Sequence, residues 1–564
     1  MTAGTFDRAQ ALAALADREF DVLVVGGGIT GAGVALDAAS RGLRTALVER
    51  DDFASGTSSK SSKLVHGGLR YLQNGDIRLV YEALRERQRL RRNAPHLVRL
   101  LPFLIPLFSK DGLINPKVAR ALGSAMWMYD LTGGARIGKI HKRLKKGAAV
   151  AHMPTLPEER LAGAYLYYDA AADDARLTLT LARTAAVRHG AVVANHTAVV
   201  ELLHDAEGAV RGALVDALGP DGAQRIEVRA RCVVNAAGVW SDDVRALDEG
   251  THPDSIRPAK GIHITVPWAK VRNDIAVVVP VPKDKRSVFV VPWLPTGDGG
   301  FHLTYIGTTD TDYDGPVDDP QCTPDDVDYL IGAINLAVRE PLVPEDVVGT
   351  WAGLRPLVKA ASSGRTADLS RRHKVSVSPG RMVSVTGGKL TTYREMAEDT
   401  VDEVVGILGD LPRSAKRTRT RRLRLLGGDA SPAAGTSTHL AGRFGTEAVG
   451  VQALVAADPT LGEPLVEGLP YLRAEAVYAA RHEMARTVDD VLSRRTRARL
   501  QARDASAGAA ADVADLLAAE LGWSKAEASR QAAAYVALVV AERDAPGLPV
   551  TGPAPTKPRK KAAR

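Results

Sequence analysis

A short apolar run followed by closely spaced glycines lies near the start of the chain. Residues 20–25 (FDVLVV) are mostly apolar and rich in valine, which predicts one buried strand. Small residues at 32–40 predict a helix, and the apolar run at 43–48 predicts a second strand. Three glycines with G-x-G-x-x-G spacing separate the first strand from the helix: Gly26, Gly28 and Gly31. This order predicts an α/β unit with parallel strands.

Each of these glycines has a physical role in binding a dinucleotide. The first allows a tight turn, the second lets the backbone approach a pyrophosphate, and the third lets the helix pack closely on the sheet. The helix N-terminus adds free N–H groups and the positive end of the helix dipole. Glu49 follows the second strand, 23 residues after Gly26, where an acid is expected to bind the adenosine ribose. The motif by itself is compatible with NAD or FAD.

Two later strands also end in glycines that precede a helix. Residues 231–235 (RCVVN) lead to Gly238, and residues 382–386 (MVSVT) lead to Gly387 and Gly388. Three such turns, far apart in sequence, are expected to converge on one extended cofactor, and this favours FAD because NAD needs fewer of them. The cofactor residues expected at the second and third turns are Gly238, Gly388, Thr391 and Thr392, with both threonines near the isoalloxazine.

A loop and a sheet are expected to complete the site. Residues 51–71 are rich in serine, threonine and glycine and follow the dinucleotide unit directly, so this loop should run beside the cofactor. Three hydroxyls are expected along the diphosphate and ribityl: Thr57, Ser58 and Ser62. Residues 257–310 alternate apolar and polar positions, which predicts an antiparallel sheet that forms a substrate wall.

The pattern changes after residue 415, where alanine and arginine dominate and helical periodicity replaces strands. The chain is therefore expected to divide into an FAD-dependent region at 20–415, a helical domain at 416–545 and a disordered basic tail at 546–564. FAD binding is expected at about 20–95, 165–255 and 350–410, and the substrate sheet at about 96–164 and 256–349. The expected fold class is α/β: an FAD-binding Rossmann-like domain of the glutathione-reductase type, an antiparallel-sheet substrate domain and an all-α C-terminal domain.

Composition narrows the class of protein. The chain has 564 residues, enough for several domains, and its 45% hydrophobic and 25% charged residues are typical of a globular protein. Cys232 and Cys322 form neither a disulfide framework nor a zinc motif, and the 13 histidines show no ligand spacing, so we expect no metal. We find no secretion signal and no apolar stretch of about 20 residues, so we expect a cytoplasmic protein that does not span a membrane.

Two basic segments leave alternatives open. The net charge of +8 is modest, so no nucleic-acid partner is expected, and part of this charge lies in the C-terminal tail. That tail either keeps the protein soluble or contacts anionic lipid or nucleic acid. The apolar run at 100–108 and the basic run at 139–146 (KIHKRLKK) either lie on an anionic membrane or form a core segment and a solvated loop.

Several runs of the sequence resemble one enzyme family. They are SSKLVHGGLRYL at 61–72, IRPAKGIHITV at 256–266, IGTTDTDYDG at 306–315, GLRPLV at 353–358 and TGGKLTTYREMAED at 386–399. Over most of residues 20–405 the chain is similar to the membrane-associated FAD-dependent glycerol-3-phosphate dehydrogenases, the quinone-linked respiratory enzymes. The resemblance implies FAD, oxidation of sn-glycerol 3-phosphate to dihydroxyacetone phosphate, and electron transfer to a membrane quinone at the inner face of the plasma membrane. It leaves open whether the helical domain forms a homodimer.

The same runs contain the candidate substrate residues. The substrate is a phosphate dianion with a secondary alcohol, so it requires fixed cations at one end. The resemblance implies that Arg70, Arg355 and Lys389 are these cations, with Arg355 also polarising the developing carbonyl oxygen and Lys389 also a candidate to stabilise the reduced flavin. Tyr71 is expected to hydrogen-bond the phosphate or the ketone.

The identity of the base and of the electron acceptor stays open. His66 and His263 are both candidates to accept the proton of the C2 hydroxyl, and the sequence does not choose between them. A related oxidase would pass electrons to oxygen, but this chain lacks the long insertion that such oxidases carry. A third interpretation is a non-catalytic flavoprotein scaffold with a partner-binding helical domain. The intact glycines, Glu49 and the cations disfavour it.

Overall fold

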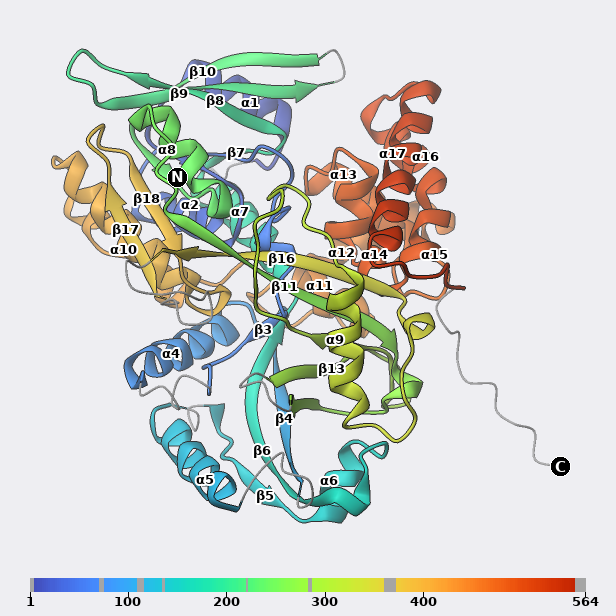
Figure 1. Ribbon diagram of the computed structural model, residues 1–564. Coiled ribbons are helices and arrows are strands. Elements are labelled where there is room, and N and C mark those ends of the chain that lie inside the picture. Colours follow the sequence, from blue (N-terminus) through green and yellow to red (C-terminus); the bar gives the residue numbers. More distant parts are fainter. Residues whose placement is uncertain are drawn as a thin grey trace.

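The computed structural model describes residues 5–69, 76–108, 116–133, 137–219, 222–281, 287–359 and 372–552. These residues form two β-sheets and a helical region that packs beside them (Figure 1). The predicted fold class, α/β with an antiparallel-sheet domain and an all-helical C-terminal part, is confirmed. The predicted domain limits at residues 415 and 545 stay predictions.

The first sheet is the α/β part of the molecule. Its strand order is β17-β18-β10-β1-β2-β7, and the neighbouring pairs from β18 to β7 are parallel. The strands are β1 (Glu19–Val25), β2 (Thr45–Val48), β7 (Val192–Ala194), β10 (Gly222–Asn235), β17 (His373–Val377) and β18 (Val383–Gly387). A hairpin of β8 (Thr197–His204) and β9 (Val210–Gly219) extends β10. The carboxyl ends of β1, β10 and β18 lie at one edge, so the three glycine turns converge as predicted.

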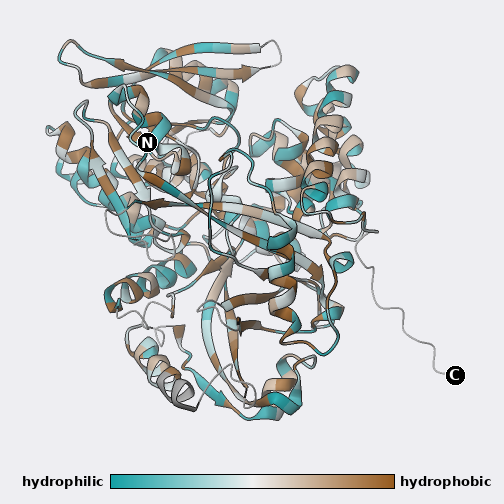
Figure 2. Ribbon diagram, viewed as in Figure 1, coloured by the Kyte–Doolittle hydropathy of each residue, from teal (hydrophilic) through white to brown (hydrophobic). Residues whose placement is uncertain are grey.

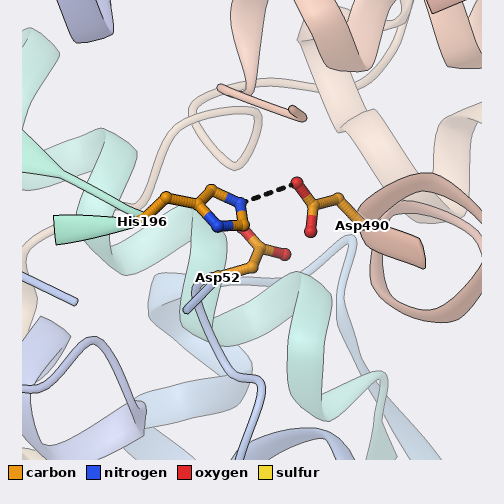
Figure 3. Close-up of side chains that lie close together, drawn as sticks. All are labelled: Asp52, His196 and Asp490. Carbon is orange, nitrogen blue, oxygen red and sulfur yellow. Dashed lines mark hydrogen bonds and ion pairs between the residues drawn. The ribbon is translucent and has the colours of Figure 1, made fainter. Parts of the chain in front are cut away.

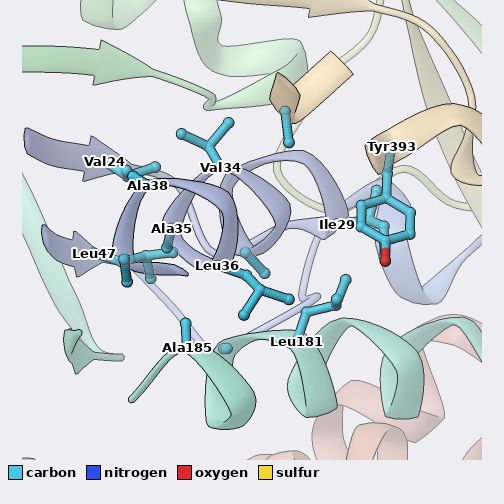
Figure 4. Packing of buried hydrophobic residues seen from close by; sticks show 14 of the residues in the cluster. Val24, Ile29, Val34, Ala35, Leu36, Ala38, Leu47, Leu181, Ala185 and Tyr393 are labelled. Carbon is cyan, nitrogen blue, oxygen red and sulfur yellow. The ribbon is translucent and has the colours of Figure 1, made fainter. Parts of the chain in front are cut away.

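Small side chains bring the helices close to this sheet. Helix α2 (Ile29–Arg41) lies between the sheet and helix α7 (Asp174–His189). Figure 4 shows Ala38 of α2 beside Val24 of β1, and Leu36 directed toward Leu181 of α7. A Cβ added to Gly33 would lie 2.7 Å from Cδ2 of Tyr393, the first residue of α10 (Tyr393–Leu408). The glycine and alanine content of α2 therefore allows this close packing.

The second sheet is mainly antiparallel, as the alternating pattern at 257–310 predicts. Its order is β15-β11-β14-β13-β12-β4-β6-β3, with β16 beside β11 and β5 beside β6. The strands are β3 (Leu64–Val65), β4 (Val98–Phe108), β5 (Lys142–Leu144), β6 (Leu161–Ala172), β11 (Ile256–Pro267), β12 (Ala276–Pro280), β13 (Ser287–Pro295), β14 (Phe301–Gly307), β15 (Thr311–Asp312) and β16 (Gly349–Val358). Figure 2 shows strongly hydrophobic residues on β13 and its neighbours, which face helix α9 (Pro324–Asn335) in a shared core.

The apolar run at 100–108 belongs to the core of this second sheet. It forms most of β4, which pairs with β6 on one side and with β12 on the other. Phe103, Leu104 and Phe108 are at most 2% exposed. The membrane interpretation of this run is therefore wrong, and the core interpretation is confirmed.

The C-terminal region is helical and has its own hydrophobic core. Its helices are α11 (Thr438–Phe444), α12 (Ala448–Ala457), α13 (Arg473–His482), α14 (Ala498–Gln501), α15 (Arg503–Gly508), α16 (Ala510–Leu521) and α17 (Lys525–Asp544). The other helices are α1 (Arg8–Asp17), α4 (Ile77–Asn93), α5 (Pro116–Leu131), α6 (Lys146–His152) and α8 (Ser241–Glu249). Within the described ranges, no helix combines the length and the apolar character needed to cross a membrane.

The helical pattern predicted after residue 415 is interrupted between α13 and α14. Helix α13 ends at His482, Met484 has a positive φ of 54°, and a six-residue π-helical turn, η13 (Asp490–Arg495), follows. The interruption frees backbone carbonyls for contacts with the FAD-binding region. Asn195 Nδ2 donates to the carbonyl of Met484 at 2.9 Å. Tertiary hydrogen bonds therefore outweigh the local preference for a continuous helix.

The first residues of the predicted tail contact the folded protein. Leu548 is 5% exposed and packs into the core of the second sheet. The backbone N–H and the hydroxyl of Thr551 both donate to Asp504, at 2.9 and 2.8 Å. One buried apolar side chain and two hydrogen bonds thus hold residues 548–551 on the folded protein. The remainder of the predicted tail, from residue 553, lies outside the described residues.

Candidate functional site

The three glycine turns enclose a cavity of about 380 Å³ at the edge of the first sheet. We call this site the glycine cradle. Its lining includes Gly26, Gly28, Gly238, Gly387, Gly388, Glu49, Thr57 and Ser58. Gly238, Gly387 and Gly388 have positive φ angles of 61°, 74° and 78°, which glycine adopts without strain. All three turns thus present backbone to one elongated space.

The glycine cradle has no room for side chains at its first turn. Gly26 has a φ of 109°, and a Cβ there would lie 2.7 Å from the carbonyl oxygen of Ala236. A Cβ on Gly31 would lie 1.9 Å from the carbonyl oxygen of Gly26. Such close backbone packing, at the N-terminus of α2, is the arrangement that a dinucleotide pyrophosphate requires. The residues present therefore fit FAD.

Glu49 lies at the expected end of the glycine cradle. Its carboxylate accepts hydrogen bonds from the backbone N–H of Gly27 at 2.6 Å and of Asp51 at 2.9 Å. Burial raises the pKa of Glu49 to about 6, and the charges of Asp51 and Asp52 act in the same direction. The two hydrogen bonds orient the carboxylate at the cavity, which suits an acceptor for ribose hydroxyls.

The hydroxyls of the loop after Glu49 have different partners. Ser58 Oγ accepts from the backbone N–H of Ile29 at 2.8 Å, at the start of α2. Thr57 Oγ1 donates to the carbonyl of Leu354 at 2.6 Å. Both residues line the glycine cradle, but Ser62 is not among the described residues that line it. Ser62 Oγ instead shares a hydrogen bond of 2.9 Å with His263 Nε2. The structure therefore places Ser62 at the second sheet, in contrast to the expected position along the diphosphate.

His263 is a buried residue of β11, in the sheet that is predicted to form the substrate wall. Its ring stacks on Trp351 with a centroid distance of 4.6 Å and an interplanar angle of 8°. The residue is 2% exposed. Burial, and then the charges of Lys63 and Arg355, hold the pKa of His263 well below its usual range. A Cβ on Gly307 would lie 2.0 Å from its ring, so glycine is required opposite this histidine.

Arg355 is held in one orientation on β16. Its guanidinium donates to Asp310 Oδ1 at 3.0 Å, to Thr308 Oγ1 at 3.2 Å and to the carbonyl of Thr309 at 3.0 Å. The side chain remains 24% exposed. A guanidinium that several acceptors orient and that stays partly exposed can bind an anion or stabilise a developing oxyanion.

The remaining predicted residues lie at the junction between the two sheets or outside the described part. The backbone N–H of His66 donates to Thr391 Oγ1 at 3.1 Å, and the His66 ring lies edge-on to Phe289. Thr391 and Thr392 are each 2% exposed and belong to the 3-10 turn η8 (Leu390–Thr392) before α10. Lys389 precedes this turn and lines the glycine cradle. Arg70 and Tyr71 lie outside the described residues.

Several residues of the site were not singled out from the sequence. Asp310 orients Arg355, and its position inside the IGTTDTDYDG run was an available signal. Trp351 stacks on His263. Lys63 and Asp174 form a buried ion pair of 3.2 Å, with the Lys63 ammonium 4.6 Å from the centre of the Trp351 ring. No local sequence pattern predicts this ion pair, because Lys63 and Asp174 come together only in the folded protein.

A cluster of Asp52, His196 and Asp490 lies between the FAD-binding and helical regions (Figure 3). His196 Nε2 lies 3.0 Å from Asp490 Oδ2. Asp52 accepts from Arg494 Nε and from Arg495 Nη1, each at 2.6 Å. Guanidinium groups already neutralise these carboxylates and would repel a cation, so the cluster is an ion-pair network rather than a metal site.

Comparison with known proteins agrees with this geometry. Residues 21–391 match a family model described as "FAD dependent oxidoreductase". Residues 418–528 match a model described as "C-terminal domain of alpha-glycerophosphate oxidase". The first match covers both sheets, the second covers most of the helical region, and residues 392–417 lie between them.

Full-length relatives narrow the family. The chain is 40% identical over 555 residues to glycerol-3-phosphate dehydrogenase 2 of Mycobacterium tuberculosis, covering 96% of this chain and 91% of the relative. It is 38% identical over 534 residues to the mitochondrial glycerol-3-phosphate dehydrogenase of Homo sapiens, covering 90% and 71%.

Solved structures give the same answer. The crystal structure of the glycerol-3-phosphate dehydrogenase from Bacillus halodurans complexed with FAD aligns with a TM-score of 0.74 at 30% identity, covering 95% of this chain and 98% of that one. The L-alpha-glycerophosphate oxidase of Mycoplasma pneumoniae, at 18% identity and a TM-score of 0.53, shares the fold. A non-catalytic scaffold is therefore set aside. The chain is an enzyme with FAD as its cofactor, and it belongs to the family of FAD-dependent glycerol-3-phosphate dehydrogenases.

Proposed function

We propose that this enzyme oxidises sn-glycerol 3-phosphate to dihydroxyacetone phosphate and passes the electrons to a membrane quinone. The observation that supports this most directly is the loop at 57–66, which joins the glycine cradle to the wall formed by His263 and Arg355. FAD, when bound, supplies the acceptor for the hydride that leaves C2. The chain's own residues bind the phosphate, orient the alcohol and move its proton.

The cations have distinct tasks in this proposal. Arg355 is oriented by Asp310 and directs its accessible side toward the oxygen on C2, where negative charge develops as the hydride leaves. Lys389, at the lip of the glycine cradle, and Arg70 bind the phosphate, with Tyr71 as a hydrogen-bonding partner. Replacing Arg355 by lysine keeps the charge but loses the fork of donors, so we expect kcat to fall about 100-fold.

We assign the proton acceptor to His66. His66 is partly exposed at the junction of the two sheets, whereas His263 is 2% exposed and bonded through Nε2 to Ser62. A general base must reach the proton it removes, and its pKa should lie near the working pH. We expect His66→Asn to lower kcat at pH 7 by about 100-fold and His263→Asn to lower it by about 10-fold. The reverse order would assign the base to His263.

One anaerobic experiment tests the reaction itself. The purified yellow protein is mixed with glycerol 3-phosphate without oxygen, and flavin absorbance near 450 nm, the usual flavin band, is followed. We expect complete bleaching with glycerol 3-phosphate and none with glycerol, which lacks the phosphate. Failure to bleach with glycerol 3-phosphate would refute the proposed function.

The electron acceptor is tested by reoxidation. The name of the matched C-terminal model and the shared fold of the Mycoplasma pneumoniae oxidase favour a second candidate, an oxidase that reduces oxygen to hydrogen peroxide. We expect a soluble quinone analogue to reoxidise the bleached enzyme at least about 100-fold faster than air does. The reason is that an active site stabilises the transition state for its own electron acceptor and not for oxygen. Equal rates with stoichiometric peroxide would establish the oxidase.

We also propose peripheral contact with an anionic membrane, at the inner face of the plasma membrane, through one exposed patch. Trp127 and Leu131 of α5 are 57% and 82% exposed, and Ile140 is 51% exposed. Basic residues surround them in sequence: Lys139, Lys142, Arg143, Lys145 and Lys146. Exposed apolar groups beside cations are typical of proteins that lie on anionic lipid. This patch replaces the run at 100–108 as the apolar element.

Vesicle binding tests this patch. We expect the protein to sediment with vesicles of anionic lipid and to be released by about 0.5 M salt, since screening weakens surface charge contacts. Leu131→Glu should reduce binding about 10-fold. The matched control is Leu218→Glu, which changes a 53% exposed leucine on β9 at the opposite end of the molecule (Figure 1). Equal loss in both variants would contradict a specific patch.

A further inference from the structure

An arginine of the helical region anchors residues 59–63, which lie in the loop between the glycine cradle and His263. Arg497 lies between η13 and α14, and its side chain is 1% exposed. Its Nη2 donates to Asp174 Oδ1 and, at 3.2 Å, to the carbonyl of Ser59. Its Nε lies 3.2 Å from Asp173 Oδ1. Arg497 thus crosses from the C-terminal region to the FAD-binding region at the start of α7.

Asp174 also binds residues of the loop that lies beside the substrate wall. Its Oδ2 accepts from the backbone N–H of Ser61 at 3.0 Å and from Ser61 Oγ at 2.7 Å. Lys63 Nζ donates to Asp174 Oδ1 at 3.2 Å and to the carbonyl of Ser59 at 3.1 Å. Residues 59–63 are therefore tied to one carboxylate that Arg497 holds from the other side.

The same loop determines the surroundings of His263. Ser62 Oγ shares its 2.9 Å hydrogen bond with His263 Nε2, and the carbonyl of Ser62 accepts from the Tyr305 hydroxyl at 3.0 Å. Trp351, which stacks on His263, donates through Nε1 to the carbonyl of Ser61 at 3.2 Å. A shift of residues 59–63 would therefore move a partner of His263 and a partner of the ring stacked on it.

We propose that Arg497 is a positioning residue through which the helical region holds residues 59–63 and, with them, the substrate wall at His263. This inference rests on the site of the proposed function. The contact that it requires is a guanidinium, because three nitrogens have separate partners: Nη2 serves Asp174 and the carbonyl of Ser59, Nε lies 3.2 Å from Asp173, and Nη1 donates to the carbonyl of Ser493 at 3.0 Å. It gives the C-terminal region a role in activity without contact with substrate.

The test compares two arginines that cross the same interface. In Arg497→Gln, Lys63 still pairs with Asp174, so the loop keeps one anchor and the fold is retained. The matched control is Arg183→Gln, because the Arg183 side chain is 7% exposed and donates to Glu447 of the helical region at 2.6 and 2.9 Å. Arg183 does not contact residues 59–63 in any hydrogen bond of the described structure.

Amide hydrogen exchange of the peptide at 59–65, measured by mass spectrometry on the FAD-bound enzyme, is the structural measurement. We expect at least about 10-fold faster exchange in Arg497→Gln and no change in Arg183→Gln. The kinetic measurement is kcat for glycerol 3-phosphate. We expect it to fall about 10- to 100-fold in Arg497→Gln, with KM within about threefold and FAD content unchanged, because small misplacements of reacting groups cost rates of this size.

Arg497→Lys sharpens the outcome. A lysine has one charged nitrogen and cannot serve Asp174, Asp173 and the carbonyl of Ser493 together, so exchange and kcat should lie between those of the wild type and Arg497→Gln. It also serves as the test variant if Arg497→Gln does not fold. Unchanged exchange at 59–65, or equal effects in Arg183→Gln, would overturn the inference. If glycerol 3-phosphate fails to bleach the wild type, the proposed reaction is refuted, and the exchange result still decides whether Arg497 positions the loop.

Discussion

Two buried surfaces of the FAD-binding region are built in opposite ways. The first turn of the glycine cradle and the adjoining face of α2 are packed through glycine, alanine and backbone, with contacts such as Ala38 on Val24. The surface toward the helical region is made of buried charges. Arg494 and Arg495 pair with Asp52, and Arg183 pairs with Glu447. The first turn leaves no space for a side chain at Gly26 or Gly31, whereas the interface depends on charged side chains.

This difference determines how each surface fails. At Gly26 or Gly31 of the glycine cradle, one added methyl group collides with a backbone carbonyl oxygen. At the interface, removal of one charge leaves its partner buried and unpaired, which costs more than the pair contributes. The stability of the interface should therefore depend on pH, and FAD binding in the glycine cradle should depend on the size of the side chain at each glycine position. The predictions below begin with the largest expected effect.

Asp52→Asn should produce the largest loss of stability. Asp52 is fully buried and accepts from both Arg494 and Arg495. Asparagine has no charge, so the guanidinium groups of Arg494 and Arg495 both lose the Asp52 carboxylate as a partner. We therefore expect the free energy of unfolding to fall by about 3–5 kcal/mol. Urea unfolding measures this. The matched control is Asp216→Asn, at an exposed pair with Arg225, which should unfold like the wild type. A small loss in Asp52→Asn would mean that solvent enters the interface.

Gly26→Ala should release the cofactor with little effect on the rest of the fold. Its Cβ would lie 2.7 Å from the Ala236 carbonyl oxygen at a φ of 109°. We expect FAD affinity, measured by flavin fluorescence, to fall about 100-fold, because the turn must move away from the pyrophosphate. Gly42→Ala is the control: it also has a positive φ, of 95°, but open space around it. It should cost about 1–2 kcal/mol of stability and leave FAD affinity unchanged.

Glu49→Gln should separate binding from stability. The folded pKa of about 6 lies above the usual value, so ionisation of Glu49 costs stability as pH rises from about 4.5 to 6. Glutamine has one acceptor oxygen, so the variant leaves one of the two backbone N–H groups unpaired at every pH, and only the pH dependence of stability reports on the pKa. As pH rises from about 4.5 to 6, the FAD-free wild type should lose stability relative to the FAD-free variant, while FAD affinity of the variant is about 10-fold lower through loss of the ribose acceptor. Thermal unfolding with and without FAD measures both. A stability difference that does not change with pH would contradict the assigned pKa.

His196→Gln should give the smallest effect and the clearest pH dependence. Burial alone would lower the pKa of His196, but the charge and hydrogen bond of Asp490 raise it above the usual value. The stabilisation is therefore complete below the unfolded pKa of about 6.5 and is lost as pH rises through the folded pKa. The wild type should exceed the variant in Tm at pH 6 and approach it at pH 9. A constant difference would show that His196 stabilises by packing alone.

Much of the fold is encoded locally. Strand β1, helix α2 and strand β2 follow from apolar runs and small residues within about thirty positions, because each pattern has the period of the element that it forms. The convergence of the three glycine turns follows from parallel pairing of β1, β10 and β18. These three turns favour FAD, and the likeness of five short runs to one family adds the substrate and the candidate residues Arg355, His263 and Lys389.

The other features of the fold and of the site were decided by tertiary structure alone, because each of them depends on residues that are distant in sequence. The run at 100–108 is apolar in any setting, and only its pairing with β6 and β12 places it in a core. Ser62 is a loop hydroxyl until folding brings His263 within 2.9 Å. Arg497 and Asp174 are 323 residues apart, and no periodicity links them. The sequence by itself determined the glycine cradle, whose geometry is limited by backbone, while the interface that supports it was decided by long-range pairing of charges.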